Sequence, residues 1–136
     1  MNECVWPVRV YYEDTDAGGV VYYANYLKFL ERARTEWLRQ LGFEQDRLLQ
    51  EYGIIFAVRE VVLGYHRPAH FNELLEVSAR IIHRGKVSLT FEQQVRRPQD
   101  HTLLCSGKVK LACVDREAMR PAPIPDPVLQ EIMHVE

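Results

Sequence analysis

The sequence predicts an α+β fold in which a five-stranded antiparallel sheet curls around one long central helix. Two observations lead to this prediction. Apolar residues in the first third repeat at helical spacing, whereas much of the second half alternates with a period of two. One helix cannot cover both faces of a flat sheet, but a curled sheet buries the apolar stripe of that helix. With 136 residues, the chain suffices for one domain with a real core, which we expect to be residues 1–136.

The first expected strand covers residues 5–13, which are rich in β-branched and aromatic types. The next segment, residues 14–19, is dense in turn-forming residues and ends in Gly18-Gly19, where the backbone can adopt a positive φ. We therefore expect the chain to bend sharply between the strand and the element that follows.

The long helix is expected over residues 24–41, where apolar residues recur at i, i+3, i+4 and i+7. Asn25 can act as its N-cap, and Gly42 follows the last periodic residue as a stop. Arg32 and Glu36 have the i, i+4 spacing of an intrahelical ion pair.

The other expected elements are a short helix over 46–51 that ends at Gly53, and strands over 54–67, 75–82, 87–96 and 102–114. The tail from Pro121 has proline at every second position as far as Pro127. We expect it to leave the sheet, because proline cannot donate a ladder hydrogen bond, and to form one or two amphipathic turns over 128–134.

Composition excludes several classes of function. The formal net charge of −2 offers no basic field for nucleic acid. No apolar run approaches the roughly 18 residues of a membrane span, and the N-terminus lacks a signal-peptide pattern, so a cytoplasmic location is expected. Three cysteines without CxxC spacing predict neither disulfides nor zinc, and Cys105 and Cys113 are expected to be buried. The five histidines show no metal-binding pairing, so no metal is expected.

Two stretches carry a resemblance: YEDTDAGGVVYYANY at residues 12–26 and FLERARTE at residues 29–36. They resemble the signature of the 4-hydroxybenzoyl-CoA thioesterase family of hotdog proteins. Within it they are most similar to acyl-CoA thioesterases of the YbgC type, which are associated with the Tol-Pal system of the cell envelope. The resemblance implies a hotdog fold and a thioesterase that releases free acid and coenzyme A without a cofactor.

The resemblance also implies the catalytic groups. The second aspartate of the Asp-x-Asp pair, which is the catalytic carboxylate of the family, corresponds to Asp16. The backbone amide that binds the oxyanion corresponds to Tyr23, at the start of the helix. In the YbgC type a histidine usually occupies this position, whereas hydroxybenzoyl-type relatives have tyrosine. A role for an imidazole at position 23 is therefore not expected, and the acyl group stays open.

These groups suit thioester hydrolysis, which needs an oxygen nucleophile and a donor for the charge that develops on the carbonyl oxygen. The first N–H groups of a helix are such donors. Asp16 could attack directly or act as a base on water. The structural alternative is an aspartate that only stabilises a turn through nearby backbone.

Further candidates surround Asp16 in the motif. Gly19 would let the substrate approach the backbone, Tyr22 would line the acyl pocket or serve packing, and Asn25 would cap the helix or support the site. Asp14 is expected to be structural or to support the groups that touch the substrate. Glu31, on the helix, is a minor catalytic candidate, with a solvated charge or an intrahelical pair as the alternative.

A second group of candidates lies on the turn Arg84-Gly85-Lys86 and at Ser88. Its cations could bind the phosphates of coenzyme A, or form an ordinary charged hairpin. The resemblance implies a homodimer with the active site between subunits, or a homotetramer, so Asp16 and Arg84 could come from different chains.

Two other functions compete with acyl-CoA hydrolysis. One is a binding module for an acyl ligand or acyl carrier protein, linked to phospholipid synthesis or the cell envelope, with little hydrolysis. The other is a dehydratase on the same fold, which requires a histidine and a carboxylate at one β-hydroxyacyl group. Tyr23 in place of histidine counts against the dehydratase.

Overall fold

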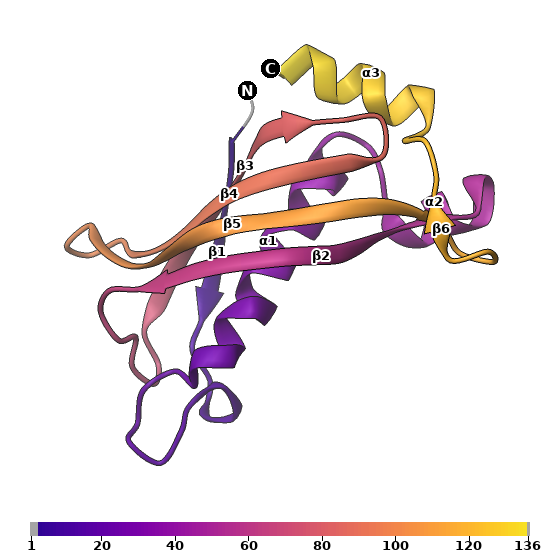
Figure 1. The fold of residues 1–136 in the computed structure, drawn as a ribbon. Helices are drawn as coiled ribbons and strands as arrows, with labels where there is room; N and C mark the ends of the chain where they lie inside the picture. Colours follow the sequence, from indigo (N-terminus) through magenta and orange to yellow (C-terminus); the bar gives the residue numbers. More distant parts are fainter. Residues whose placement is uncertain (1–2, 136) are drawn as a thin grey trace.

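The structure, a computed structural model, describes residues 3–135 and contains one curled antiparallel sheet (Figure 1). The five long strands lie in the order β1-β3-β4-β5-β2. Their bounds are Glu3–Arg9 for β1, Ile54–Tyr65 for β2, Leu74–Arg84 for β3, Ser88–Arg97 for β4 and Thr102–Asp115 for β5. All neighbouring pairs are antiparallel, so the predicted α+β architecture is confirmed.

The long helix α1, Tyr26–Gln40, packs its apolar stripe against β1 and β3. Phe29, Leu30 and Ala33 are buried along this stripe, and the ring of Trp37 meets Phe91 of β4 edge-on with centroids 5.2 Å apart. The sheet therefore wraps the helix and encloses a single core, as the helical spacing of apolar residues predicted (Figure 1).

Two shorter helices complete the fold. Helix α2, Gln45–Tyr52, ends at Gly53, whose φ of +67° is the left-handed conformation expected at that stop. Helix α3, Asp126–Val135, is longer than the one or two turns predicted and buries Val128 and Ile132 against the core. No helix among residues 3–135 is long and apolar enough to cross a membrane.

The first strand ends earlier than predicted. Strand β1 stops at Arg9, and Tyr12–Asp14 form a 3₁₀ turn instead of continuing the strand. The Asp14 carboxylate accepts the Tyr11 backbone N–H at 2.8 Å, and the Asp14 backbone N–H donates to the Tyr11 carbonyl at 3.0 Å. These contacts turn the chain away from the sheet before residue 13. They outweigh the strand propensity of the last residues in the predicted range 5–13.

The proline tail does pair with the sheet, contrary to expectation. Strand β6, Arg120–Pro121, pairs with the end of β5, and Ala122 N donates to Cys113 O at 2.8 Å. The contact is possible because β4 begins opposite Ala112 and so leaves the last residues of β5 open on that side. Pro121 itself has no N–H to donate, which keeps the ladder to two residues.

The predicted ion pair between Arg32 and Glu36 is also replaced. Glu36 forms a salt bridge with Arg39, one turn closer to the helix end, while Arg32 lies over the Phe29 ring at 5.9 Å from its centroid. The basic side chain of Arg39 in the last turn also complements the negative end of the helix dipole.

Strands β1 and β2 form the two edges of the sheet. Strand β2 carries a bulge between Val58 and Glu60, and Val58, Val61 and Val62 are exposed. Its partner strand β5 approaches so closely that a Cβ on Gly107 would lie 2.1 Å from the Val62 carbonyl oxygen.

The cysteines confirm the prediction for strand β5. Cys105 and Cys113 are buried, and burial raises the pKa of each thiol to about 11. Both therefore stay protonated and pack as small apolar side chains.

Candidate active site

The segment between the 3₁₀ turn and α1 folds into a small hairpin that presents Asp16 at its tip. Thr15 and Val21 form a β-bridge, Asp16 N donates to Val20 O at 2.9 Å, and Gly19 N donates to Asp16 O at 3.0 Å. Gly19 has a φ of +79°. A side chain there would meet no atom within 4 Å, so the turn requires glycine for its backbone conformation and not for space.

The Asp16 carboxylate is exposed and has one oxygen engaged. Its Oδ1 accepts the Gly18 N–H at 2.8 Å, which is the backbone contact of a turn aspartate. Within residues 3–135 no hydrogen-bond donor contacts Oδ2, and Asp16 is one of the residues that line a cleft. The turn contact expected of a structural aspartate is thus present. It uses only one of the two carboxylate oxygens, so the other is available for chemistry.

The cleft has a volume of about 350 Å³ and lies between the Asp16 hairpin, the start of α1 and the end of β2. Its lining residues are Asp16, Val20, Val21, Tyr23, Tyr26, Tyr65, His66, Arg67 and Pro68. The structure therefore places the expected carboxylate and the expected oxyanion-binding residue in one cleft.

Tyr23 is the first residue of a 3₁₀ turn, Tyr23–Asn25, that continues directly into α1. The structure records no acceptor for the Tyr23 N–H among residues 3–135, whereas the Tyr22 N–H donates to the Asp14 carbonyl at 2.9 Å. At the positive end of this helical segment the Tyr23 N–H is thus a donor without a recorded acceptor in the described part of the chain, and Tyr23 lines the same cleft as Asp16.

Asp14 and Asn25 connect the hairpin to the helix. Both side chains are buried, with 3% and 7% exposure, and Asn25 Nδ2 donates to Asp14 Oδ1 at 2.5 Å. Asn25 occupies the N-cap position, but its side chain makes no capping hydrogen bond, so the predicted cap is wrong. The Asn25 side chain contacts the buried Asp14 carboxylate and therefore does not cap the helix. Asn25 thus joins the segment before the hairpin to the start of the helix, through its contact with Asp14.

Aromatic side chains form the walls around the helix start. Tyr65, at the end of β2, donates its hydroxyl to the Tyr23 carbonyl at 3.0 Å, and its ring packs edge-on against Tyr26 at 5.6 Å. Burial raises the pKa of both Tyr26 and Tyr65, so each phenol stays protonated. Tyr22 lies outside the lining residues and packs its ring against Tyr23 at 4.8 Å between centroids.

Sequence reasoning missed the wall that comes from the end of β2 and the loop after it. Tyr65, His66, Arg67 and Pro68 line the cleft but stand more than forty residues after Asp16, and no spacing in the sequence points to them. His66 is also bound to the sheet, with its Nε2 2.8 Å from Ser106 Oγ.

The turn with Arg84, Lys86 and Ser88 lies at the other end of β3 from the Asp16 hairpin (Figure 1). It is a turn as predicted, closed by Gly85 N donating to Ser88 O at 2.8 Å. The start of β3 lies beside the hairpin, and the eleven residues of β3 span roughly 35 Å at about 3.3 Å per residue. Within one chain, the structure therefore does not bring this turn to Asp16.

Glu31 is likewise apart from Asp16. It lines a separate cavity of about 90 Å³ between α1 and the sheet, together with Arg34, and accepts the Thr35 hydroxyl at 2.6 Å. Arg34 is buried and donates to the Gln93 side-chain oxygen at 3.0 Å. Burial lowers the pKa of Arg34 to about 10, and the nearby Glu31 charge partly offsets this effect.

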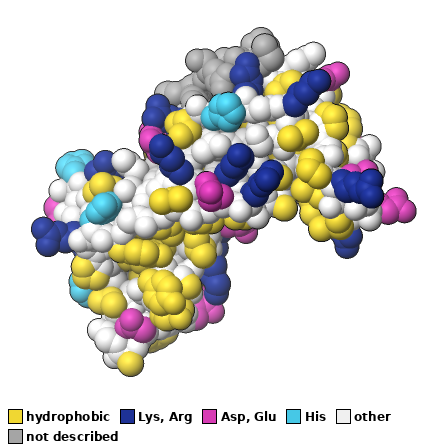
Figure 2. Space-filling view, in the orientation of Figure 1, with side chains coloured by type: hydrophobic (Ala, Val, Ile, Leu, Met, Phe, Trp, Pro, Cys, Tyr) yellow, Lys and Arg dark blue, Asp and Glu magenta, His cyan; other side chains and the backbone are white. Residues whose placement is uncertain are grey.

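A larger hollow of about 540 Å³ adjoins the same end of the molecule, but neither Asp16 nor Tyr23 lines it. Tyr12 and Phe71 stack there with ring centroids 3.9 Å apart, and both are exposed. Hydrophobic side chains gather at this end of the surface (Figure 2). This hollow has the larger volume, whereas the smaller cleft is lined by the expected carboxylate, Asp16, and the expected oxyanion-binding residue, Tyr23.

Comparison with known proteins gives consistent matches. Residues 10–132 match the thioesterase-like superfamily. The chain is 44% identical over 126 residues to the acyl-CoA thioester hydrolase YbgC of Escherichia coli O6:H1, covering 93% of this chain and 92% of that protein. It is also 44% identical over 135 residues to the acyl-CoA thioesterase YbgC of Haemophilus influenzae, covering 99% and 98%.

Solved structures agree on the fold. A probable thioesterase from Bartonella henselae superposes with a TM-score of 0.85 at 33% identity, covering 90% of this chain and 99% of that one. A 1,4-dihydroxy-2-naphthoyl-CoA thioesterase from Synechocystis superposes with a TM-score of 0.89 at 21% identity, covering 96% of both chains. The hotdog fold expected from the sequence is confirmed.

Proposed function

Because this chain belongs to the thioesterase-like superfamily, we propose that it is an acyl-CoA thioester hydrolase that uses the Asp16 carboxylate and the Tyr23 backbone N–H. The observation that carries the proposal is that both residues line one cleft of about 350 Å³. The two relatives at 44% identity over nearly the whole chain are acyl-CoA thioester hydrolases, which supports the substrate class.

In the proposed reaction, the thioester carbonyl oxygen accepts the Tyr23 N–H, and an oxygen nucleophile attacks the carbonyl carbon. One preorganised oxyanion donor commonly lowers the barrier by roughly 3 kcal/mol. The carbon–sulfur bond then breaks, and coenzyme A leaves as the thiolate. The aromatic wall of Tyr26 and Tyr65 excludes water from one side of the acyl group, which strengthens the interaction with the N–H.

Asp16 can supply the nucleophile in two ways. Its free Oδ2 can attack the carbonyl carbon and form a mixed anhydride that water hydrolyses, or it can take a proton from an attacking water. Rapid acid quench of a single turnover, followed by digestion and mass spectrometry of the peptides, separates these routes. An acyl adduct on the Asp16 peptide indicates the anhydride, and its absence with full product release indicates the general base.

The proposed assembly is a homodimer formed across strand β2. Two such dimers could associate into a homotetramer. Strand β2 is an edge strand, and Val58, Val61 and Val62 are exposed along it. A two-fold axis would pair two such edges antiparallel. The Tyr65 end of one β2 would then lie beside the Ile54 end of the other.

This pairing gives the distant basic turn a role. The turn at Arg84 and Lys86 and the start of β4 at Ser88 lie at the same end of the sheet as Ile54. In the proposed dimer they approach the Asp16 cleft of the partner subunit, where the two cations can bind the phosphates of coenzyme A. Gly19 and Tyr22 do not line the cleft themselves, and in this proposal they contact the substrate only through their neighbours Val20, Val21 and Tyr23.

The test is a steady-state assay of the purified protein with short, long and aromatic acyl-CoAs. We expect hydrolysis of at least one class, and a loss of at least about 10²-fold in kcat for Asp16→Asn. Asp46→Asn, on the exposed face of α2, is the matched control and should behave as wild type. Equal rates for wild type and Asp16→Asn would refute the assigned carboxylate. Stable capture of acyl carrier protein with negligible turnover of every substrate would instead favour the binding module.

A further inference from the structure

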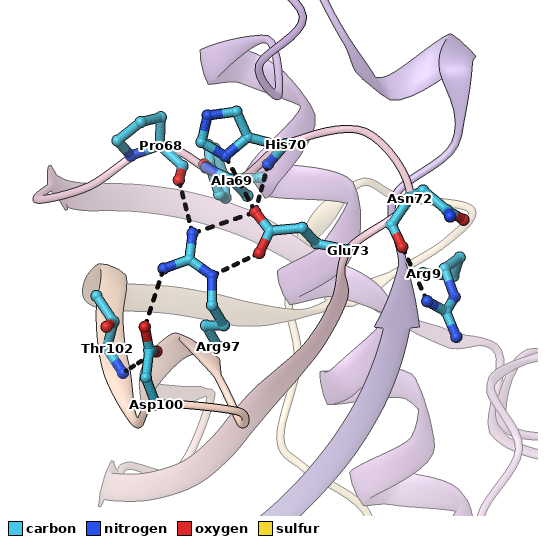
Figure 3. A network of polar contacts seen from close by, with 10 residues as sticks. Arg9, Pro68, Ala69, His70, Asn72, Glu73, Arg97, Asp100 and Thr102 are labelled. Carbon is cyan, nitrogen blue, oxygen red and sulfur yellow. Dashed lines mark hydrogen bonds and ion pairs between the residues drawn. The ribbon is translucent and has the colours of Figure 1, made fainter.

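Glu73, immediately before β3, is the centre of a polar network beside the Asp16 hairpin (Figure 3). Its carboxylate accepts Arg97 Nε at 2.5 Å and Arg97 Nη2 at 3.1 Å, a two-pronged contact from the end of β4. The same carboxylate accepts the His70 backbone N–H at 2.7 Å and lies 3.1 Å from His70 Nδ1. Arg97 also donates to the Pro68 carbonyl at 3.3 Å.

The loop that Glu73 holds is the loop that supports the hairpin. Ala69 O accepts the Val21 N–H at 2.9 Å, and His70 forms a β-bridge with Val20. On the other side, Ala69 N donates to the Tyr26 hydroxyl at 3.2 Å, which ties the loop to the first residue of α1. Residues 69 and 70 therefore touch both the segment that presents Asp16 and the helix that presents the Tyr23 N–H.

We propose that Glu73 is a positioning residue for thioester hydrolysis, because it fixes the Pro68–His70 backbone that sets the Asp16 carboxylate relative to the Tyr23 N–H. This inference rests on the function proposed above. Glu73 touches neither the cleft nor the reacting atoms, and neither its sequence position nor the motif around Asp16 points to it.

The charge of Glu73 is essential to this role. A carboxylate accepts hydrogen bonds at both oxygens, whereas an amide at this position would place an N–H donor against Arg97 or His70. Arg97 holds the pKa of Glu73 down at about 2, so the carboxylate persists at every pH at which the enzyme would work. The other charged or titratable groups around it are His70 on its own loop, Asp100 at 3.6 Å from Arg97, and Tyr26 of α1.

The network is anchored on strands of the main sheet that lie outside the hairpin. Arg97 is the last residue of β4, and the Asp100 carboxylate that pairs with it accepts the Thr102 N–H of β5 at 3.1 Å. On the β1 side, Arg9 donates to the Asn72 carbonyl at 2.8 Å. The loop is thus fixed at both sides of Glu73 to the sheet.

The test compares Glu73→Gln, which keeps size and removes charge, with the matched control Glu76→Gln, an exposed residue of β3. We expect kcat of Glu73→Gln to fall by about 10²-fold with KM changed by less than about threefold, because small misplacement of a reacting group has this effect. Hydrogen exchange at the Val21 amide should quicken in Glu73→Gln and stay as wild type in Glu76→Gln. Arg97→Lys keeps the positive charge but cannot make the two-pronged contact with the Glu73 carboxylate, so it should give an intermediate kcat.

The outcomes separate this inference from the proposed function. A wild-type protein that hydrolyses no acyl-CoA refutes the proposed function, and exchange at Val21 then still tests the coupling between Glu73 and the hairpin. An active wild type with unchanged kcat in Glu73→Gln overturns the positioning role. So does a loss of kcat without any change in exchange at Val21, because the effect would then not pass through the hairpin.

Discussion

The Asp14 carboxylate and the Asn25 side-chain amide are joined by a 2.5 Å hydrogen bond that connects the 3₁₀ turn before the Asp16 hairpin to the 3₁₀ turn before α1. Replacing Asn25 with alanine leaves a buried carboxylate oxygen without its donor. We expect the free energy of unfolding to fall by about 1–3 kcal/mol and kcat to fall more than KM changes. Urea denaturation and steady-state kinetics measure the two effects.

Asn25→Asp provides the comparison for this prediction. It keeps the shape of the side chain and places a second carboxylate against Asp14, so its loss of stability should exceed that of Asn25→Ala. Unchanged stability and kcat in Asn25→Ala would show that the hairpin is held without this contact.

In the proposed mechanism Tyr23 acts through its backbone N–H and not through its ring. Tyr23→Pro removes the N–H, and Tyr22 already has the extended conformation that precedes proline, with φ −60° and ψ 132°. We expect kcat to fall by about 10²–10³-fold in Tyr23→Pro, because one oxyanion donor is lost. Tyr23→Phe, the matched control, keeps the N–H and should retain most of its kcat. Equal activity of the two variants would remove the oxyanion role from this position.

The ion pair of Glu73 and Arg97 predicts a pH dependence of stability. The pKa of Glu73 is lowered from 4.5 to about 2 in the folded chain. A depressed carboxyl pKa contributes stability that is fully present above pH 4.5 and is lost as the pH falls toward 2. The difference in Tm between wild type and Arg97→Gln should therefore be constant above pH 4.5 and narrow below it.

Arg47→Gln is the control for this series. Its partner Glu51 lies one turn further along the same exposed helix, and surface pairs of this kind contribute little to stability. Its Tm should stay close to that of wild type across the range. If the difference in Tm between wild type and Arg97→Gln is as small as that between wild type and Arg47→Gln, the contact between Glu73 and Arg97 does not stabilise the fold.

Gly107 is required by the close approach of β2 to β5. A Cβ at this position would lie 2.1 Å from the Val62 carbonyl oxygen, so alanine must push the two strands apart. We expect Gly107→Ala to lower the free energy of unfolding by about 3 kcal/mol, at the upper end for overpacking. Gly64→Ala is the control, because its Cβ would meet no atom nearer than 3.4 Å. Thermal or urea unfolding of both variants tests the difference.

The exposed edge of strand β2 allows the proposed homodimer to be tested. Val58 and Val62 are 53% and 62% exposed, and glutamate at both positions would bring like charges together across a two-fold axis. We expect the double variant Val58→Glu, Val62→Glu to elute as a monomer in size-exclusion chromatography with light scattering. Val5→Glu, on the opposite edge at 48% exposure, should leave the dimer intact. A wild-type monomer at assay concentration would refute the proposed dimer.

The sequence predicted the elements whose signals are local. The 3.6 spacing of α1 and the alternation of β3 and β4 come from neighbouring residues, and the glycines at 42 and 53 fixed the helix ends. The family motif added Asp16 and Tyr23, which the structure brings into one cleft.

What could not be predicted depends on residues far apart in the chain. The pairing of Asp14 with Asn25 removed a helix cap that the local pattern favoured, since a buried carboxylate needs its donor more than an exposed helix end does. The wall from Tyr65 to Pro68 and the anchor at Glu73 arise only when β2 and β3 meet the hairpin.

Among residues 11–19, which include Asp16, only the side chain of Asp14 is buried, and this stretch is held by hydrogen bonds and by the stacking of Tyr12 on Phe71. Segments with few buried apolar contacts open locally at a lower free energy than core strands. On warming, turnover should therefore cease while the sheet around Phe91 is still folded, and it should return on cooling. The upper working temperature of the enzyme would then be set by nine residues rather than by the core.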